Sequence, residues 1–267
     1  MHQYRLEKIA KAFDRHQAAV DGIDLEIERA ERVAFIGPSG GGKTTLFRML
    51  NCTLRPTSGK LWINGDEVSD LHGRRLRTVR RKIGTIYQQH NLVPRLRVIH
   101  NVLSGQLGRW STLPSLVSLL RPQDAELAYK ALRQVGIEEK IFSRTDELSG
   151  GQQQRVAIAR VLMQDPEVIL ADEPVSSVDP SLASAIVKLL IDISHDTGKT
   201  LLVNLHSVDL ALAYFPRVIG VKNGVTLFDL SPPQITDDLL EDLYSGHLPE
   251  KEEEKLTDEE SRTPFLQ

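Results

Sequence analysis

A glycine-rich run near the start of the chain has the residue types and spacing that hold the phosphates of a nucleotide. Glycines leave backbone N–H groups bare, and successive N–H groups can curl around a phosphate. Lys43 offers a point charge to the β- and γ-phosphate oxygens, and the Thr44 hydroxyl suits Mg²⁺. An apolar run at 33–36 precedes the glycines and a helical pattern follows them, as such a loop requires. The candidate phosphate-binding residues are Gly37, Pro38, Ser39, Gly40, Gly41, Gly42, Lys43, Thr44 and Thr45.

Two adjacent carboxylates and a histidine could supply the chemistry of hydrolysis. Asp172 and Glu173 follow the apolar run 168–171, and His206 follows the apolar run 201–205. Mg²⁺ prefers oxygen ligands and keeps several waters, so Asp172 could hold it through one of those waters. Glu173 could orient and deprotonate an attacking water, and His206 could hydrogen-bond a γ-phosphate. Each has a structural alternative, because strands commonly end in acidic residues and a lone histidine is more often a satisfied structural residue.

A second candidate anion site lies at residues 149–152, near the start of the octet Leu148-Ser149-Gly150-Gly151-Gln152-Gln153-Gln154-Arg155. Ser149 is a good helix N-cap, and Gln152 can complete a capping box with it. Gly150 and Gly151 leave bare N–H groups at the positive end of the helix that follows, where an anionic phosphate is favoured. The octet therefore predicts a phosphate site at a helix N-terminus.

The elements that must position these residues follow from the apolar runs. Nearly continuous apolar runs at 33–36, 168–171 and 201–205 are typical of parallel strands buried on both faces, so their functional ends should meet at one sheet edge. Asn64-Gly65 and Asn223-Gly224 indicate tight hairpin turns. From about residue 91 to residue 160 the pattern is helical, with an amphipathic helix expected over 123–134. The fold class is therefore α/β.

Composition narrows the class of protein. The chain has 267 residues, 40% of them apolar, and a formal net charge of −3, which gives no footprint for nucleic-acid binding. No apolar run has the length of a membrane span, and the N-terminus lacks the apolar core of a secretory signal. The lone Cys52 is interpreted as a packed residue, and the basic run 74–82 as the solvated face of a short helix. Residues 246–267 are expected to form an acidic, solvated or disordered tail.

All these motifs, in this order, resemble those of the ATP-binding-cassette (ABC) ATPases. The resemblance covers about residues 1–245 as a single domain and implies a P-loop NTPase (RecA-like) core. An antiparallel β subdomain and an inserted helical signature subdomain at about 91–160 would complete it. It also implies a homodimer that closes on ATP and Mg²⁺, with residues 149–152 of one copy capping the γ-phosphate bound by the other.

Four further assignments come from this resemblance. Gln88 is identified with the glutamine that reaches Mg²⁺ and the attacking water, in preference to its neighbour Gln89. His206 matches the histidine at the γ-phosphate. Asp179 resembles the acidic anchor of a loop that crosses the dimer interface. Phe13 stands where the family places an aromatic ring on adenine, although a core phenylalanine is the rival interpretation.

Finer features are similar to the ATP-binding subunit of bacterial phosphonate importers. They include the segment 87–103, the long stretch 105–120 and the residues around His206, while Ser207 and Tyr87 depart from the usual pattern. This implies a peripheral subunit on the cytoplasmic face of the inner membrane, with two membrane permease subunits and a periplasmic solute-binding protein as partners. An importer for amino acids, phosphate or metal, a lipoprotein-release system, a soluble DNA- or ribosome-acting cassette and a cassette that only binds nucleotide are the alternatives.

Overall fold

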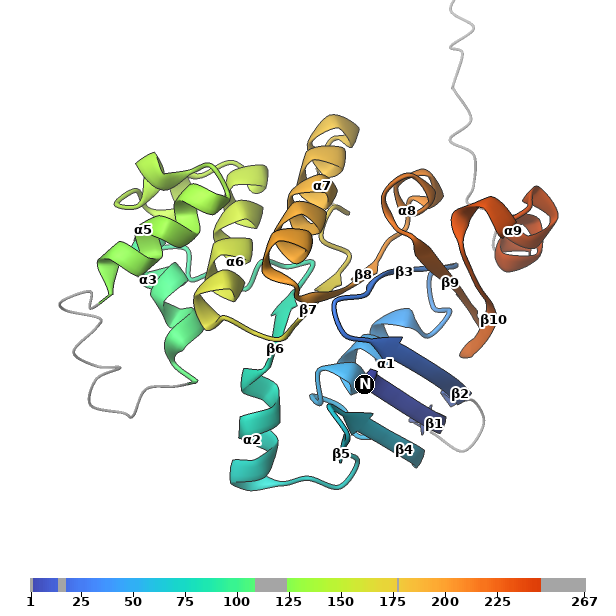
Figure 1. The fold of residues 1–267 in the computed structure, drawn as a ribbon. Helices are drawn as coiled ribbons and strands as arrows, with labels where there is room; N and C mark the ends of the chain where they lie inside the picture. Colours follow the sequence, from blue (N-terminus) through green and yellow to red (C-terminus); the bar gives the residue numbers. More distant parts are fainter. Residues whose placement is uncertain (1, 14–17, 109–123, 177, 246–267) are drawn as a thin grey trace, which may run out of the picture.

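A six-stranded sheet forms the centre of the molecule (Figure 1). A computed structural model describes residues 2–13, 18–108, 124–176 and 178–245. The strand order is β10-β9-β3-β8-β7-β6, with all neighbours parallel except β10, which is antiparallel to β9. The strands are β3 (Arg32–Ile36), β6 (Ile83–Ile86), β7 (Val168–Asp172), β8 (Thr200–Asn204), β9 (Arg217–Lys222) and β10 (Val225–Leu230).

The three apolar runs are adjacent parallel strands, as the sequence predicted. β3 pairs with β8, and β8 pairs with β7, so that Asp172 lies opposite Asn204 at the shared edge. Successive side chains of a strand point to opposite faces, and each face here has its own core. Ala34 and Ile36 belong to one cluster, whereas Val33 and Phe35 belong to the other. Burial on both faces explains why these runs are apolar throughout.

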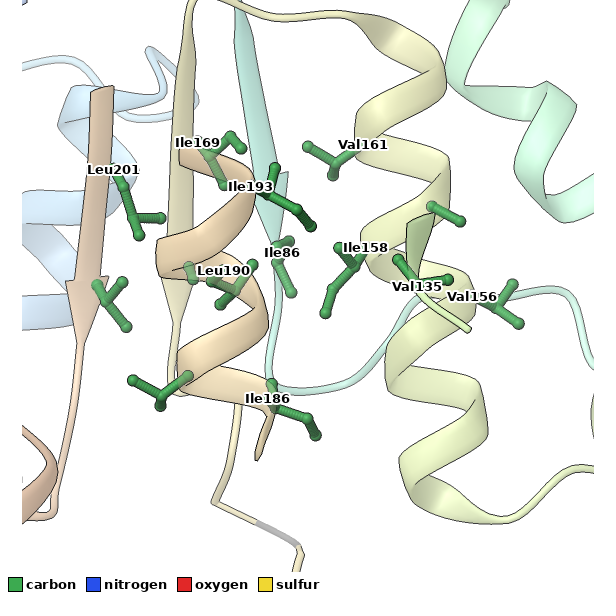
Figure 2. Packing of buried hydrophobic residues seen from close by; sticks show 14 of the residues in the cluster. Ile86, Val135, Val156, Ile158, Val161, Ile169, Ile186, Leu190, Ile193 and Leu201 are labelled. Atoms are coloured by element: carbon green, nitrogen blue, oxygen red, sulfur yellow. The ribbon is translucent and has the colours of Figure 1, made fainter. Parts of the chain in front are cut away.

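Helices α6 (Gly150–Gln164) and α7 (Pro180–Thr197) cover one face of the sheet. Figure 2 shows Ile158 and Val161 of α6 and Ile186, Leu190 and Ile193 of α7, which belong to the same buried cluster as Ile86, Ile169 and Leu201 of the strands. Helices α3 (Val98–Leu103) and α5 (Ala125–Gln134) pack on the outer side of α6 and extend this core away from the sheet. The expected amphipathic helix is thus present as α5, while residue 123 lies outside the described residues.

The opposite face of the sheet packs on helix α1 (Lys43–Leu50) and on a second, antiparallel sheet of order β2-β1-β4-β5. Phe47 of α1 meets Phe35 of β3 edge to face, with ring centroids 5.3 Å apart. Both predicted Asn-Gly turns are present, with positive φ at Asn64 (54°) and Asn223 (49°). This second sheet consists of β1 (His2–Ala12), β2 (Ala18–Glu28), β4 (Ser58–Ile63) and β5 (Asp66–Glu67).

The remaining elements lie at the periphery. Helix α2 (Gly73–Arg81) buries none of its residues, which confirms the solvated basic helix. Among the described residues, no helix has both the length and the apolar character needed to cross a membrane. The expected acidic tail and residues 109–120 of the long stretch fall outside the described residues. The other helices in the described ranges are α8 (Val208–Tyr214) and α9 (Asp237–Tyr244), with single 3₁₀ turns at η1 (Ser104–Gln106), η2 (Glu138–Lys140), η3 (Thr145–Glu147) and η4 (Pro232–Gln234).

Candidate active site

The glycine-rich loop runs from the end of β3 to the start of α1 and lies against the β9–β10 hairpin. A Cβ added at Gly37 would lie 2.0 Å from the carbonyl oxygen of Val221, and φ at Gly37 is +143°. The N–H of Gly224 donates to the carbonyl of Gly41 across 2.9 Å. Gly42 caps α1 in the left-handed region, with φ 106°. The loop therefore needs glycine for its close backbone contacts as well as for its bare N–H groups.

Lys43 lies inside the curl of this loop. Its Nζ donates to the carbonyl oxygens of Gly37 and Pro38 across 2.6 and 2.9 Å, and the residue is 4% exposed. Burial lowers the pKa of the Lys43 ammonium, and the nearby carboxylates of Glu173 and Asp172 oppose that shift. The ammonium therefore has backbone acceptors as its direct partners and two carboxylates close by.

Asp172 is held at the end of β7 by two donors from other elements. Its Oδ1 accepts from Nδ2 of Asn204 across 2.6 Å and lies 3.4 Å from the Thr44 hydroxyl. Burial raises the pKa of the Asp172 carboxyl, while the Asn204 hydrogen bond favours the ionised form. Carboxylate and hydroxyl oxygens meet here between the loop and the sheet edge.

Glu173 leaves the strand in a left-handed conformation, with φ 52°, and its side chain meets His206. Oε1 of Glu173 lies 2.7 Å from Nε2 of His206. The N–H of Glu173 donates to the carbonyl of Asn204 across 3.1 Å, which fixes the turn against β8. Glu173 and His206 border a cavity of about 360 Å³ together with Ser176. The carboxylate that the sequence assigned to the attacking water and the histidine that it assigned to the γ-phosphate are thus direct neighbours.

Gln88 lies at the same sheet edge, beyond β6. Ile86, the last residue of β6, pairs with Ala171 of β7, next to Asp172. Gln88 and Gln89 are both exposed in the loop that follows. The preference for Gln88 therefore stays a prediction based on the resemblance.

The predicted capping box is present at the start of α6. The Ser149 hydroxyl accepts from the N–H of Gln152 across 3.4 Å, and Oε1 of Gln152 accepts from the N–H of Ser149 across 3.1 Å. A Cβ added at Gly151 would lie 2.3 Å from Cδ2 of Leu182 on α7, whereas one at Gly150 meets nothing within 4 Å. In the described part of the chain, no hydrogen bond joins this segment to the glycine-rich loop.

Asp179 caps helix α7. Its Oδ1 accepts hydrogen bonds from the N–H of Leu182 and from the Ser181 hydroxyl, and these bonds lower the pKa of the Asp179 carboxyl.

Phe13 lies at the surface and not in the core. Its side chain belongs to a residue that is 62% exposed, and Nζ of Lys11 lies 5.5 Å from the ring centroid. The core interpretation of Phe13 is therefore wrong.

Asn204 is the site residue that sequence reasoning missed. Its side chain is fully buried and positions Asp172 through the 2.6 Å hydrogen bond. The available signal was a single polar residue inside the apolar run 201–205. Such a residue in a doubly buried strand needs a hydrogen-bond partner, and the neighbouring strand end supplies one.

Comparison with known proteins agrees with this geometry. The family model for ABC transporters matches residues 20–176. The phosphonates import ATP-binding protein PhnC of Pseudomonas fluorescens (strain Pf0-1) is 45% identical over 242 residues, 90% of this chain and 91% of that protein. PhnC 2 of Halalkalibacterium halodurans is 40% identical over 240 residues, 90% of this chain and 98% of that protein.

Solved cassettes have the same fold. The ATP-binding cassette MJ0796, in a dimeric post-hydrolysis state bound to ADP and Pi, superposes with a TM-score of 0.75 and 31% identity, covering 86% of this chain and 98% of that one. Clostridium perfringens cbiO1, part of the transporter complex cbiONQ, gives 0.77 and 27%, covering 93% and 96%. The chain therefore belongs to the ABC transporter family, as an ATP-binding cassette that hydrolyses ATP.

Proposed function

We propose that this chain is the ATP-hydrolysing subunit of a bacterial importer for phosphonates or related phosphorus oxyanions. The assignment of phosphonate as the cargo rests on 40–45% identity, over about nine-tenths of the chain, to proteins named as phosphonate import subunits. The observation that carries hydrolysis is the meeting of Lys43, Asp172, Glu173 and His206 at one sheet edge.

The glycine-rich loop binds the β- and γ-phosphates of ATP through its N–H groups, and Thr45 extends this contact into α1. Lys43 can turn from its two carbonyl partners to the phosphate oxygens, because both partners belong to the same loop. Phe13, exposed at the end of β1, receives the adenine ring.

The oxygens of Thr44 and Asp172 fit Mg²⁺, which takes few protein ligands and keeps waters and phosphate oxygens. No cluster of three or more His, Cys, Asp or Glu side chains that could enclose a metal is present in the described ranges, which agrees with such a partly open site. Thr44, Asp172 and Gln88 would hold the ion, and it would neutralise charge developing on the phosphates.

Glu173 orients the attacking water and accepts its proton as the water oxygen bonds to the γ-phosphorus and the bond to ADP breaks. His206 holds the Glu173 carboxylate in place through the 2.7 Å contact and offers a hydrogen bond to the γ-phosphate. Charge stabilisation and positioning, more than covalent chemistry, drive this type of reaction.

Completion of the site requires a second copy of the chain. Residues 149–152 form an anion site at a helix start, and within one copy they have no hydrogen bond to the described glycine-rich loop. In the proposed homodimer, Ser149, Gly150, Gly151 and Gln152 cap the γ-phosphate held by the partner, with Asp179 at the interface. The dimeric state of MJ0796 supports this arrangement.

The permease subunits are proposed to dock at the loop that carries Gln88. A cavity of about 440 Å³ borders that loop, and its lining includes Tyr87 and Asn91. Four arginines and no carboxylate line it, so an acidic segment of a permease would fit. The chain would then be peripheral on the cytoplasmic face of the inner membrane, and a periplasmic solute-binding protein would complete the complex.

Reconstitution with the permease and solute-binding protein encoded beside it tests the function. ATP hydrolysis should rise when the binding protein carries methylphosphonate and stay basal when it carries phosphate or glycine. Stimulation by glycine but not by methylphosphonate would overturn the cargo assignment. No ATP hydrolysis in the complete complex would overturn the catalytic assignment and favour a cassette that only binds nucleotide.

A further inference from the structure

Helix α6 begins at the capping box around Ser149 and, farther along, contacts the loop that carries Gln88. The contact is made by Arg160, whose Nη1 donates to the carbonyl of Asn91 across 2.6 Å and whose Nη2 donates to the carbonyl of His90 across 2.9 Å. A guanidinium is a planar fork with several fixed donors, so one side chain holds two consecutive carbonyls in a set geometry.

The Arg160 guanidinium makes this contact at the cost of partial desolvation. Burial lowers its pKa, with Tyr87 opposing that shift, and no carboxylate forms an ion pair with it in the described part of the chain. An arginine without an anionic partner, held against two backbone carbonyls, indicates a positional requirement at this loop. Asn91 has φ 49°, so the chain direction at the contact depends on a backbone conformation that few residues adopt.

A second link joins the same loop to the start of α6. The side chain of His90 hydrogen-bonds to Gln153. Nε2 of Gln153 in turn donates to the carbonyls of Thr145 and Leu148, across 3.2 Å in each case. Leu148 directly precedes the capping serine, so the loop is tied to α6 at both its signature end and its Arg160 end.

The helix between these links is a rigid connector. α6 has 15 residues, and a helix of that length extends about 22 Å. A Cβ added at Gly105 would lie 2.2 Å from the carbonyl oxygen of Arg160, so η1 also presses directly on this turn of the helix. A shift of the loop would therefore displace the whole helix and, with it, the anion site at Ser149 and Gly150.

We propose that Arg160 is a positioning residue that couples the Gln88 loop to the signature end of α6. It acts through the carbonyls of His90 and Asn91 and touches neither the nucleotide nor the reacting atoms. Docking of a permease on the loop is then transmitted to residues 149–152, which face the nucleotide of the partner copy. This inference rests on the proposed transporter function.

Arg155 offers a matched control on the same helix. Its Nη1 also donates to a backbone carbonyl, that of Val135, which belongs to the α5 end of the helical layer and not to the loop. Arg155→Ala therefore removes the same kind of side chain and hydrogen bond without releasing residues 90–91. Arg160→Lys keeps the positive charge but cannot hold both carbonyls with one planar fork.

The experiment compares wild type, Arg160→Ala, Arg160→Lys and Arg155→Ala in the complete reconstituted complex. ATP affinity of each isolated subunit and stimulation of its hydrolysis by the binding protein loaded with methylphosphonate are measured. Arg160→Ala should keep its ATP affinity within about twofold of wild type. The stimulation of its ATP hydrolysis should fall by at least about fivefold, a factor that corresponds to an ordinary coupling free energy between two sites. Arg160→Lys should lie between it and wild type, and Arg155→Ala should be stimulated like wild type.

Four outcomes are decisive. Full stimulation of Arg160→Ala, or an equal loss in Arg155→Ala, would overturn the coupling role of Arg160. If Arg160→Ala fails to fold, Arg160→Lys decides, because a correctly folded lysine variant with wild-type stimulation also overturns it. Absence of stimulation in the wild-type complex would instead be a failure of the proposed function, so the two failures are distinguishable.

Discussion

At the scale of single residues, the site is a set of charges whose partners come from different elements. Lys43 on α1 is held by loop carbonyls, Asp172 on β7 by Asn204 on β8, and Glu173 by His206. The contacts of Lys43 and Asp172 are buried or half-buried, where hydrogen bonds to charged groups are strong and misplacement is costly. The positions of the reacting groups are therefore fixed by neighbours that do not react.

Replacement of the proposed base tests this arrangement most directly. Glu173→Gln keeps the shape of the side chain and an oxygen that can accept a hydrogen bond from His206. The amide cannot accept a proton, so we expect ATP binding to persist and phosphate release to slow by at least about 10²-fold. Glu167→Gln, an exposed site that bonds Asn64, is the control. Turnover of Glu173→Gln close to that of the control would contradict the assignment.

The buried thiol of Cys52 should make the free energy of unfolding fall at high pH. Burial raises the pKa of this thiol from 9.0 to about 11. As pH rises from 9 to 11 the unfolded chain loses the thiol proton while the folded chain keeps it, so stability that is present below pH 9 is lost. Wild type should lose roughly 2–3 kcal/mol more than Cys52→Ala over this interval.

Urea unfolding at a series of pH values measures this difference. Alanine retains a Cβ at a position with φ 58°, so the comparison leaves the backbone strain unchanged. Parallel pH profiles for the two proteins would show that the thiol stays protonated in both states or is exposed in the folded one.

At the scale of elements, the β9–β10 hairpin is the support on which the phosphate-binding loop lies. The carbonyl of Val221 leaves no room for a Cβ at Gly37, and Gly224 bonds to Gly41. Lys222, the last residue of β9, in turn holds the end of α9 through the carbonyl of Asp242 and the hydroxyl of Ser245. Elements remote in sequence therefore determine the shape of the loop.

Two glycine substitutions separate this packing from simple backbone strain. Gly37→Ala places a Cβ 2.0 Å from the Val221 oxygen, whereas Gly40→Ala meets nothing within 4 Å although φ is also positive there, at 75°. We expect Gly40→Ala to cost about 1–2 kcal/mol of stability. Gly37→Ala should cost clearly more, in the range of about 4 kcal/mol for exceptional substitutions, and should abolish ATP binding. Equal unfolding midpoints in urea would contradict a support role for the hairpin.

The sequence predicted the elements better than the contacts between them. Continuous apolar runs indicated parallel strands, two Asn-Gly pairs indicated turns, and Ser149 with Gln152 indicated the capping box, because each pattern reflects local geometry. Neither the Val221 carbonyl beneath Gly37 nor the Arg160 contact with the loop has a local signature. Both depend on which elements the fold brings together, and only the structure shows that.

At the scale of the whole molecule, the proposed homodimer divides catalysis between two copies of the chain. In this proposal one copy supplies the glycine-rich loop, Asp172, Glu173 and His206, and the other supplies the segment around Ser149. A symmetric dimer of this kind has two equivalent sites, each built from different parts of the two copies. Isolated monomers should therefore hydrolyse ATP poorly.

Mixing two inactive variants tests the division. Ser149→Arg should abolish transport and leave ATP binding by its own loop intact, and Glu173→Gln should be inactive through its base. In a mixed dimer one site carries both defects and the other carries neither, so an equal mixture should regain about a quarter of wild-type ATP hydrolysis by random pairing. An inactive mixture, with ATP binding and melting temperature retained in both variants, would refute the contribution of Ser149 in trans.

The carbonyl groups that bind Lys43 when no phosphate is present matter for successive rounds of ATP hydrolysis. Its ammonium has already lost most of its water and is held by the carbonyls of Gly37 and Pro38. An incoming phosphate therefore exchanges places with acceptors of the loop, and the cation need not be dehydrated anew in each cycle. When phosphate and ADP leave, the same two carbonyls are at hand, and the loop returns to its starting arrangement without refolding.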